Sequence, residues 1–170
     1  MDNQTKNKKQ QELVMSRIFS VPREEIWKAW TEPDMAKKWW GPREFTAPVI
    51  QIDLRVGGKY VNCMRSPDGI DYWGTGVYKE VSPPKRLVLT DSFADEKGNI
   101  VSAAFYGMDI GFPMESIITV TLDEVDGKTK FTMKYDDVSA MKDEDLQGMK
   151  LGWSESFDKL EEYLSRQELS

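Results

Sequence analysis

The C-terminal stretch DEDLQGMKLGWSESFDKLEEYL, residues 143–164, decides the fold. Large apolar side chains recur in it at intervals of three or four residues, which predicts a long helix with one apolar stripe. The stripe consists of Leu146, Met149, Trp153, Phe157, Leu160 and Leu164. Gly148 and Gly152 each cost roughly 1 kcal/mol relative to alanine inside a helix. We therefore expect them to allow close contact between this helix and a sheet, or to mark a kink.

Seven segments upstream of this helix have the pattern of strands, and turn signals separate them. They are Leu13–Ser20, Phe45–Leu54, Lys59–Arg65, Asp71–Val81, Arg86–Phe93, Met114–Leu122 and Thr129–Asp137. After the first strand, Pro22 followed by Glu24 and Glu25 predicts the start of a helix, and residues 34–39 predict a second, short one. A run of neighbouring strands is typical of an antiparallel sheet. The sequence therefore predicts an α+β fold in which a curved sheet buries the helical stripe.

The composition excludes several classes of protein. Among 170 residues, 23 Lys and Arg stand against 29 Asp and Glu, and this net charge of −6 does not favour binding to nucleic acid. Histidine is absent and there is one cysteine, which excludes histidine-based triads, an internal disulfide and histidine or thiolate metal sites. No apolar run approaches the ~20 residues that span a bilayer. We expect a cytoplasmic monomer or weak homodimer without a cofactor, with a disordered tail over residues 1–10 and one domain over 11–167.

Motifs for nucleotide or covalent chemistry are weak in this chain. The DLRVGG segment at 53–58 lacks the spacing of a phosphate-binding loop, so we expect an ion pair between Asp53 and Arg55 followed by a glycine turn. Cys63 has no histidine to activate it, and we expect it to be a buried structural side chain. Paired carboxylates such as Glu161–Glu162 are typical of a solvated helix face. We therefore predict no catalytic residue and no metal ligand.

The segment Trp39–Trp40–Gly41–Pro42 ends the second predicted helix. Adjacent side chains at a helix end point about 100° apart, so at most one of the two indoles can lie fully in the core. We expect the pair to seal one end of the sheet, with contact to a ligand as the alternative.

A set of aromatic, methionine and other side chains can line a cavity between sheet and helix. The candidate ligand-binding residues are Trp40, Tyr60, Met64, Tyr72, Tyr78, Leu89, Asp91, Phe93, Ile118, Val120, Met133, Tyr135, Met149, Trp153 and Phe157. The alternative is that the same side chains fill a closed core. Strand phase matters here, because a slip of one residue reverses which side chains face inward. The long connection over residues 94–112 can act as a lid.

Five segments, in order, resemble the Aha-type heat-shock ATPase activator homologue-like family of the START/polyketide cyclase-like (SRPBCC) superfamily. They are VPREEIWKAWTEPDMAKKWWGP (21–42), DLRVGGKY (53–60), GVYKEVSPPKRLVLTDSF (76–93), DGKTKFTMKY (126–135) and GWSESFDKLEEYL (152–164). The resemblance implies a helix-grip (START/Bet v-like) fold, with a curved antiparallel sheet around the long C-terminal helix and a cavity between them. It also implies that many relatives bind apolar small molecules there. Asp91 stands where relatives often carry an aromatic residue.

We therefore expect a small-molecule binding protein whose cavity holds a hydrophobic ligand, such as a lipid, a polyketide or a flavonoid-like compound. One alternative implied by the resemblance is a cyclase or hydrolase that uses a carboxylate or tyrosine as general acid or base, and Asp91 is the first carboxylate to examine. A buried Asp91 that faces the cavity with a raised pKa would favour this alternative. A third possibility is a chaperone-associated interaction protein, which we favour least, because eukaryotic-type activators carry an additional N-terminal domain where this chain has about ten tail residues.

Overall fold

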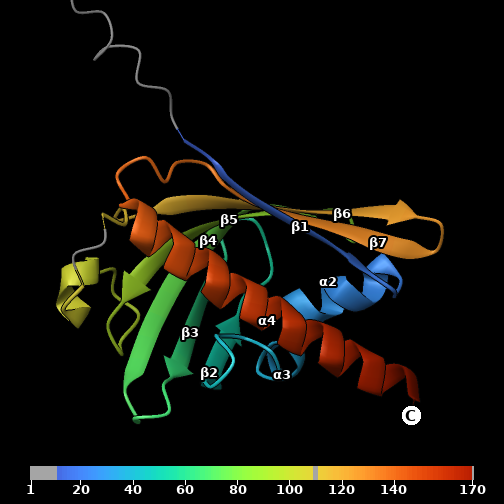
Figure 1. Ribbon diagram of the computed structural model, residues 1–170, viewed down its shortest axis with the longest axis horizontal. Coiled ribbons are helices and arrows are strands. Elements are labelled where there is room, and N and C mark those ends of the chain that lie inside the picture. The colour runs from blue at the N-terminus through green and yellow to red at the C-terminus, as the bar shows by residue number, and fades with distance from the viewer. Residues whose placement is uncertain (1–10, 109–110, 170) are drawn as a thin grey trace, which may run out of the picture.

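The computed structural model of the protein describes residues 11–108 and 111–169, and the predicted tail over residues 1–10 lies outside this range. The first part of the chain forms β1 (Leu13–Phe19), α2 (Arg23–Thr31), α3 (Pro33–Ala36), β2 (Thr46–Ile52), β3 (Lys59–Arg65), β4 (Asp71–Ser82) and β5 (Arg86–Ala94). The second part forms the 3₁₀ helix η1 (Ala103–Tyr106), β6 (Ser116–Val125), β7 (Lys128–Tyr135) and the long helix α4 (Asp143–Leu169). The order of strands and long helices is the predicted one (Figure 1).

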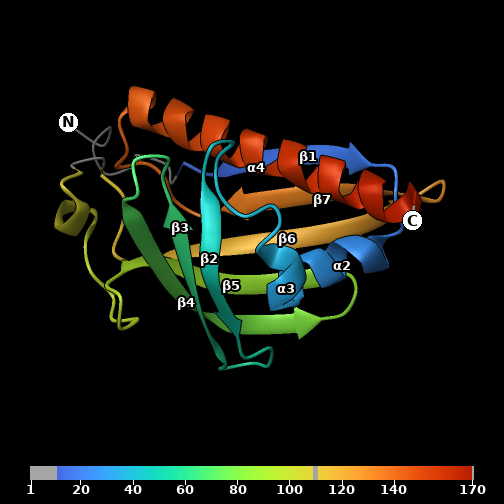
Figure 2. The same cartoon turned by 90° about the horizontal axis from the view of Figure 1, so that it is seen from below.

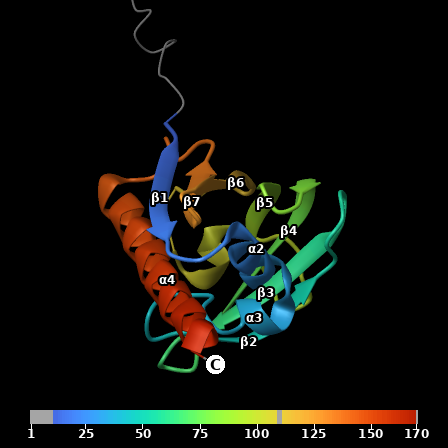
Figure 3. The same ribbon diagram turned by 90° about the vertical axis from the view of Figure 1, so that its right-hand side faces the viewer.

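The seven strands form one antiparallel sheet in the order β1-β7-β6-β5-β4-β3-β2. Figure 3 shows that the sheet curls into an open arc, and α4 lies across its open side. Arg17 of β1 donates a hydrogen bond to Asp158 of α4 (2.8 Å), so this edge of the sheet is held to the helix. The fold is the expected helix-grip architecture, in which a curled sheet encloses one long helix.

The two short helices close one end of this arc, as Figure 2 shows. Helix α2 contacts β6 and α3 contacts β2, so together they bridge strands that lie far apart in the order of the sheet. Helix α3 ends at Ala36, three residues before the predicted end at Trp39. Trp39 is fully buried, and its Nε1 donates a hydrogen bond to the backbone oxygen of Ala29 at 3.0 Å. This indole is therefore a fixed part of the closed end.

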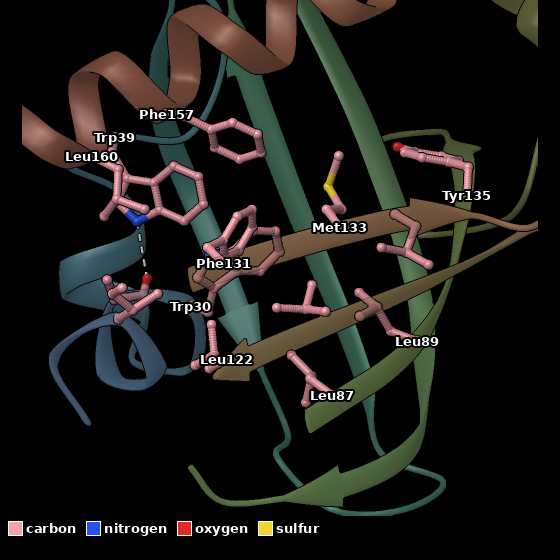
Figure 4. Close-up of a cluster of buried hydrophobic side chains, with 14 of the residues drawn as sticks. Trp30, Trp39, Leu87, Leu89, Leu122, Phe131, Met133, Tyr135, Phe157 and Leu160 are labelled. Carbon is pink, nitrogen blue, oxygen red and sulfur yellow. Dashed lines mark hydrogen bonds between the residues drawn. The ribbon is translucent and has the colours of Figure 1, made fainter. Parts of the chain in front are cut away.

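The core lies between the sheet, α4 and the closed end, and Figure 4 shows its centre. Inward-facing residues of β6 and β7 are buried in the predicted phase, as Val120, Leu122, Phe131 and Met133 demonstrate. Phe131 stacks on Trp30 of α2 (centroids 5.7 Å apart) and meets Phe157 of α4 edge-on (4.9 Å). One aromatic side chain of the sheet thus joins α2 to α4.

Sequence prediction and structure differ mainly at element ends. The sixth strand begins at Ser116 and runs to Val125, whereas the alternation in the sequence predicts Met114–Leu122. Its last three residues are exposed and continue the hairpin with β7, so apolar periodicity cannot reveal them. The short helix η1 lies inside the 94–112 connection, where we expect no regular element.

Over residues 11–108 and 111–169, the structure contains no helix with the length and apolar character that a bilayer crossing requires.

Candidate functional site

A cavity of ≈260 Å³, partly open to solvent, lies between α4 and the sheet. On α4 the wall includes Met149 and Trp153 and three small residues, Gly148, Gly152 and Ser156, which recur at intervals of four and so share one face of the helix. A Cβ built on Gly148 would meet nothing within 4 Å. Small side chains on this face leave the space between helix and sheet unfilled, which explains the two glycines that interrupt the apolar stripe.

Five aromatic side chains form a continuous wall around the cavity, and we call Trp40, Trp153, Tyr135, Phe112 and Phe93 the aromatic belt. Successive ring centroids in this order lie 5.5, 6.5, 6.4 and 5.3 Å apart. These distances are those of favourable aromatic pairs, so the wall is supported by its own contacts.

The two adjacent tryptophans, Trp39 and Trp40, occupy different environments. Trp39 lies in the core, whereas Trp40 is half-buried and faces the cavity. Lys159 of α4 holds the segment that follows, because its Nζ donates hydrogen bonds to the backbone oxygens of Gly41 (2.9 Å), Pro42 (3.1 Å) and Phe45 (3.2 Å). Burial lowers the pKa of Lys159. The ammonium thus fixes the 41–45 segment, part of the cavity wall, against the helix.

The Asp91 carboxyl lies in the cavity wall among tyrosine hydroxyls. The Tyr135 hydroxyl donates to Asp91 Oδ2 at 3.1 Å, and the Trp153 Nε1 donates to the Tyr135 hydroxyl at 3.2 Å. The Tyr60 hydroxyl donates to the backbone oxygen of Thr90 at 2.6 Å and lies 3.4 Å from Asp91 Oδ1. Side chains of β3, β5 and β7 therefore meet at this carboxyl, and α4 is linked to it through the bond from Trp153 to Tyr135.

Burial raises the pKa of Asp91 to about 6, and the hydrogen bond from Tyr135, with a weaker contribution from the Tyr60 hydroxyl 3.4 Å away, opposes this shift. Burial also raises the pKa values of Tyr60 and Tyr135 well above the ordinary value, with the neighbouring Asp91 charge as the second cause. None of the ion pairs formed by the described side chains includes Asp91. The site therefore holds a carboxyl that can gain or lose a proton near neutral pH between two tyrosines that stay protonated.

Replacing Asp91 by asparagine is expected to change how stability depends on pH. The folded-state pKa of about 6 exceeds the ordinary ~3.9 of an unfolded aspartate. The stabilisation from this group is therefore complete below about pH 4 and is lost as the pH rises through about 6. Urea denaturation should show that the advantage of wild type over Asp91→Asn shrinks by about 1–3 kcal/mol from pH 4 to pH 7. A difference that stays constant over this range would contradict the assignment.

The structure brings about half of the candidate residues together at the cavity wall. Those at the wall are Trp40, Met64, Tyr72, Asp91, Phe93, Tyr135, Met149 and Trp153. The residues around a second void of ≈20 Å³ include Tyr60, Tyr78 and Leu89. The remaining candidates are packed in the core, namely Ile118, Val120, Met133 and Phe157. The inward faces are those predicted, but the cavity occupies only one end of the space between sheet and helix.

Several wall residues were not candidates from the sequence. They are Gly41, Pro42, Asn62, Trp73, Gly74, Ser92, Phe112, Gly148, Gly152 and Ser156. The interval of four between Gly148, Gly152 and Ser156 is the one signal that can identify part of this set. Phe112 belongs to the connection predicted as a lid, and residues 109–110 of that connection lie outside the described part of the chain.

The other motifs behave as structural elements. Asp53 and Arg55 form the expected ion pair (2.9 Å), and both are exposed. Cys63 is buried, and burial raises the pKa of its thiol to about 11, so it is not a thiolate at neutral pH. Within the described part of the chain, no group of three or more acidic or cysteine side chains is arranged to hold a metal ion.

Comparison with known protein families gives one match, which spans residues 20–165. The matching family is described as "Activator of Hsp90 ATPase homolog 1-like protein". The chain belongs to this family. The match confirms the resemblance found in the five sequence segments, and it covers strands β2 to β7, both short helices and most of α4.

Solved structures of bacterial proteins share the fold of this member of the Hsp90 ATPase activator homologue-like family. A protein from Nitrosomonas europaea is 25% identical, with a TM-score of 0.74 and coverage of 94% of this chain and 97% of its own. A Mycobacterium smegmatis protein is 28% identical, with a TM-score of 0.70 and coverage of 92% and 89%. An Arthrobacter aurescens protein is 25% identical, with a TM-score of 0.75 and coverage of 91% and 86%. No curated protein matches the chain.

Proposed function

We propose that this chain is a small-molecule binding protein that holds a hydrophobic ligand between α4 and the sheet. The observation that carries the proposal is the cavity of ≈260 Å³ with its aromatic belt. Burial of apolar ligand surface contributes about 25 cal/mol per Å², so a flat or elongated apolar compound would gain affinity along this wall. The proposed setting is the cytoplasm, to which a lone buried thiol is suited.

A second candidate is an enzyme of the cyclase or hydrolase kind that uses Asp91 as general acid or base. The observation that favours it is the position of Asp91 in the cavity wall with a pKa of about 6, which suits proton transfer near neutral pH. This candidate requires turnover of a bound compound with a pH midpoint near 6, and loss of that turnover in Asp91→Asn. Binding without conversion of any bound compound would leave the first candidate alone.

Titration with hydrophobic compounds tests the binding proposal. Suitable compounds are 1-naphthalenemethanol, a flavonoid and a fatty acid. Binding is monitored through the chemical shifts of the protein's backbone amides. We expect saturable shifts at wall residues from at least one compound. Absence of saturable shifts for the whole set would contradict the proposal.

The variant Gly152→Leu tests the same binding proposal by filling part of the cavity. A Cβ at this position would lie 3.6 Å from Pro42 Cγ, an ordinary contact, and Gly152 lines the cavity, so the leucine is expected to fill part of the cavity. Leucine also favours the helix by roughly 1 kcal/mol relative to glycine. We expect ligand affinity to fall at least about tenfold, as expected for loss of ~1.4 kcal/mol, while stability is maintained. Gln147→Leu places the same side chain at an exposed position of α4 and should bind as wild type does.

A further inference from the structure

The cavity wall carries one charged side chain among the described residues, and it is an acid. Asp91 stands among wall residues that are otherwise aromatic, aliphatic or neutral polar. A carboxylate without an ionic partner in a mostly apolar wall is costly unless a ligand compensates it. The asymmetry of charge at the wall therefore selects for ligands of one sign.

The hydrogen-bonding capacity of Asp91 is only partly used. A hydroxyl has one proton, and the 2.6 Å contact directs the Tyr60 proton to the Thr90 carbonyl rather than to Oδ1 at 3.4 Å. Tyr135 supplies the one short bond, to Oδ2 at 3.1 Å. A carboxylate accepts about four hydrogen bonds, so Asp91 retains acceptor sites for a donor that enters the cavity.

The aromatic belt complements a positive charge next to this carboxylate. Aromatic faces carry negative potential and attract cations, most strongly when the site excludes water. Tyr135 belongs to the belt and also bonds Asp91, so the carboxylate adjoins the rings directly. Acid and rings together form the surroundings in which an ammonium group is favoured over a neutral or anionic one.

We propose that the cavity selects hydrophobic ligands that carry a cationic nitrogen, with the nitrogen at the Asp91 carboxylate and the hydrocarbon part along the aromatic belt. This inference rests on the proposed binding function and names the chemical class of its ligand.

The charge of this site depends on one titratable group between pH 5 and pH 8. Tyr60 from β3, Tyr135 from β7 and Tyr78 from β4 have raised pKa values and stay neutral. From α4, the Lys159 ammonium is bound to backbone oxygens of the 41–45 segment. The chain has no histidine. With a pKa of about 6, Asp91 is mostly ionised at neutral pH and mostly protonated at pH 5, so affinity for a cation falls as the pH drops through this range.

Two probes with the same naphthylmethyl skeleton, one cationic and one neutral, test the inference, namely 1-naphthylmethylamine, protonated from pH 5 to pH 8, and 1-naphthalenemethanol. At pH 7.5 the ammonium probe should bind about tenfold tighter or more, as expected for a charge-assisted hydrogen bond with cation–π support. At pH 5.0 this preference should shrink several-fold, because the carboxyl is then largely neutral. Chemical-shift titration or calorimetry gives both dissociation constants.

Two variants test whether Asp91 causes the preference for the ammonium probe over the alcohol. Asp91→Asn should bind the alcohol as wild type does and lose the preference for the amine. Asp123→Asn removes the same charge from an exposed position on β6 and should retain the preference. Equal affinity for both probes in wild type, or a preference that survives in Asp91→Asn, would overturn the inference while the binding function stands. Failure of both probes to bind would overturn the inference, and the binding function would fall with it only if the flavonoid and the fatty acid also gave no saturable shifts.

Discussion

Replacing Phe131 by alanine is expected to lower the free energy of unfolding by about 3–5 kcal/mol, the range for truncating a fully buried aromatic side chain. Phe131 is fully buried and contacts Phe19, Trp30 and Phe157, with centroid distances of 5.8, 5.7 and 4.9 Å. Removal of the ring leaves a cavity between β7, its neighbour β1 and the helices α2 and α4. Because whole domains are stable by only about 5–15 kcal/mol, this loss is large, and urea denaturation measures it directly.

Phe105→Ala is the matched control for this prediction. The Phe105 side chain is 60% exposed, so the same truncation should change stability by less than about 0.5 kcal/mol. If Phe131→Ala proved as mild as Phe105→Ala, the aromatic contacts described for the core would be wrong.

Replacing Gly76 by alanine is expected to cost about 3 kcal/mol, at the upper end of the range for overpacking a filled interior. A Cβ on Gly76 would lie 2.0 Å from the Thr90 backbone oxygen and 2.5 Å from the Tyr60 ring, so the strand or the ring must shift. The same shift would break the hydrogen bond from the Tyr60 hydroxyl to Thr90 next to Asp91. Thermal or urea denaturation of the variant measures the effect.

Gly148→Ala is the same chemical change as Gly76→Ala, but it is expected to raise the stability of the protein. Its Cβ meets open space, and alanine is favoured over glycine inside a helix by roughly 0.5–1 kcal/mol, so this variant should be more stable than wild type. Destabilisation by Gly148→Ala, or no effect of Gly76→Ala, would contradict the packing around the cavity.

The fold follows from periodicity because its elements are long and amphipathic. The intervals in α4 and the alternation in β6 and β7 identify the buried faces without knowledge of their partners. Helix geometry predicted that at most one of Trp39 and Trp40 lies fully in the core, and only Trp39 does, although α3 ends at Ala36 and both residues lie beyond it. Helix η1 was not predicted, because four residues are too few to show a period.

The candidate site was predicted only in part, because strand phase indicates which side chains face inward but not how far α4 lies from them. Val120 and Met133 face inward as predicted, yet they are packed in the core, whereas Met64 and Phe93 lie at the cavity wall. The distance between helix and sheet depends on small residues of α4, which a search for apolar side chains passes over. Asp91 and Tyr135 are 44 residues apart, and only the register of the sheet brings them into contact.

The central claim is that a hydrophobic ligand occupies the cavity between α4 and the sheet. The chain has nine methionines, of which Met64 and Met149 line the cavity, Met133 is buried in the core and Met114 is exposed. Protein labelled with ¹³C at methionine methyl groups and saturated with a naphthalene probe reports the position of the probe through intermolecular nuclear Overhauser effects. We predict effects between the probe and the methyl groups of Met64 and Met149, and none to Met133 or Met114. Effects confined to Met114, or saturable binding without any effect at Met64 and Met149, would contradict the claim.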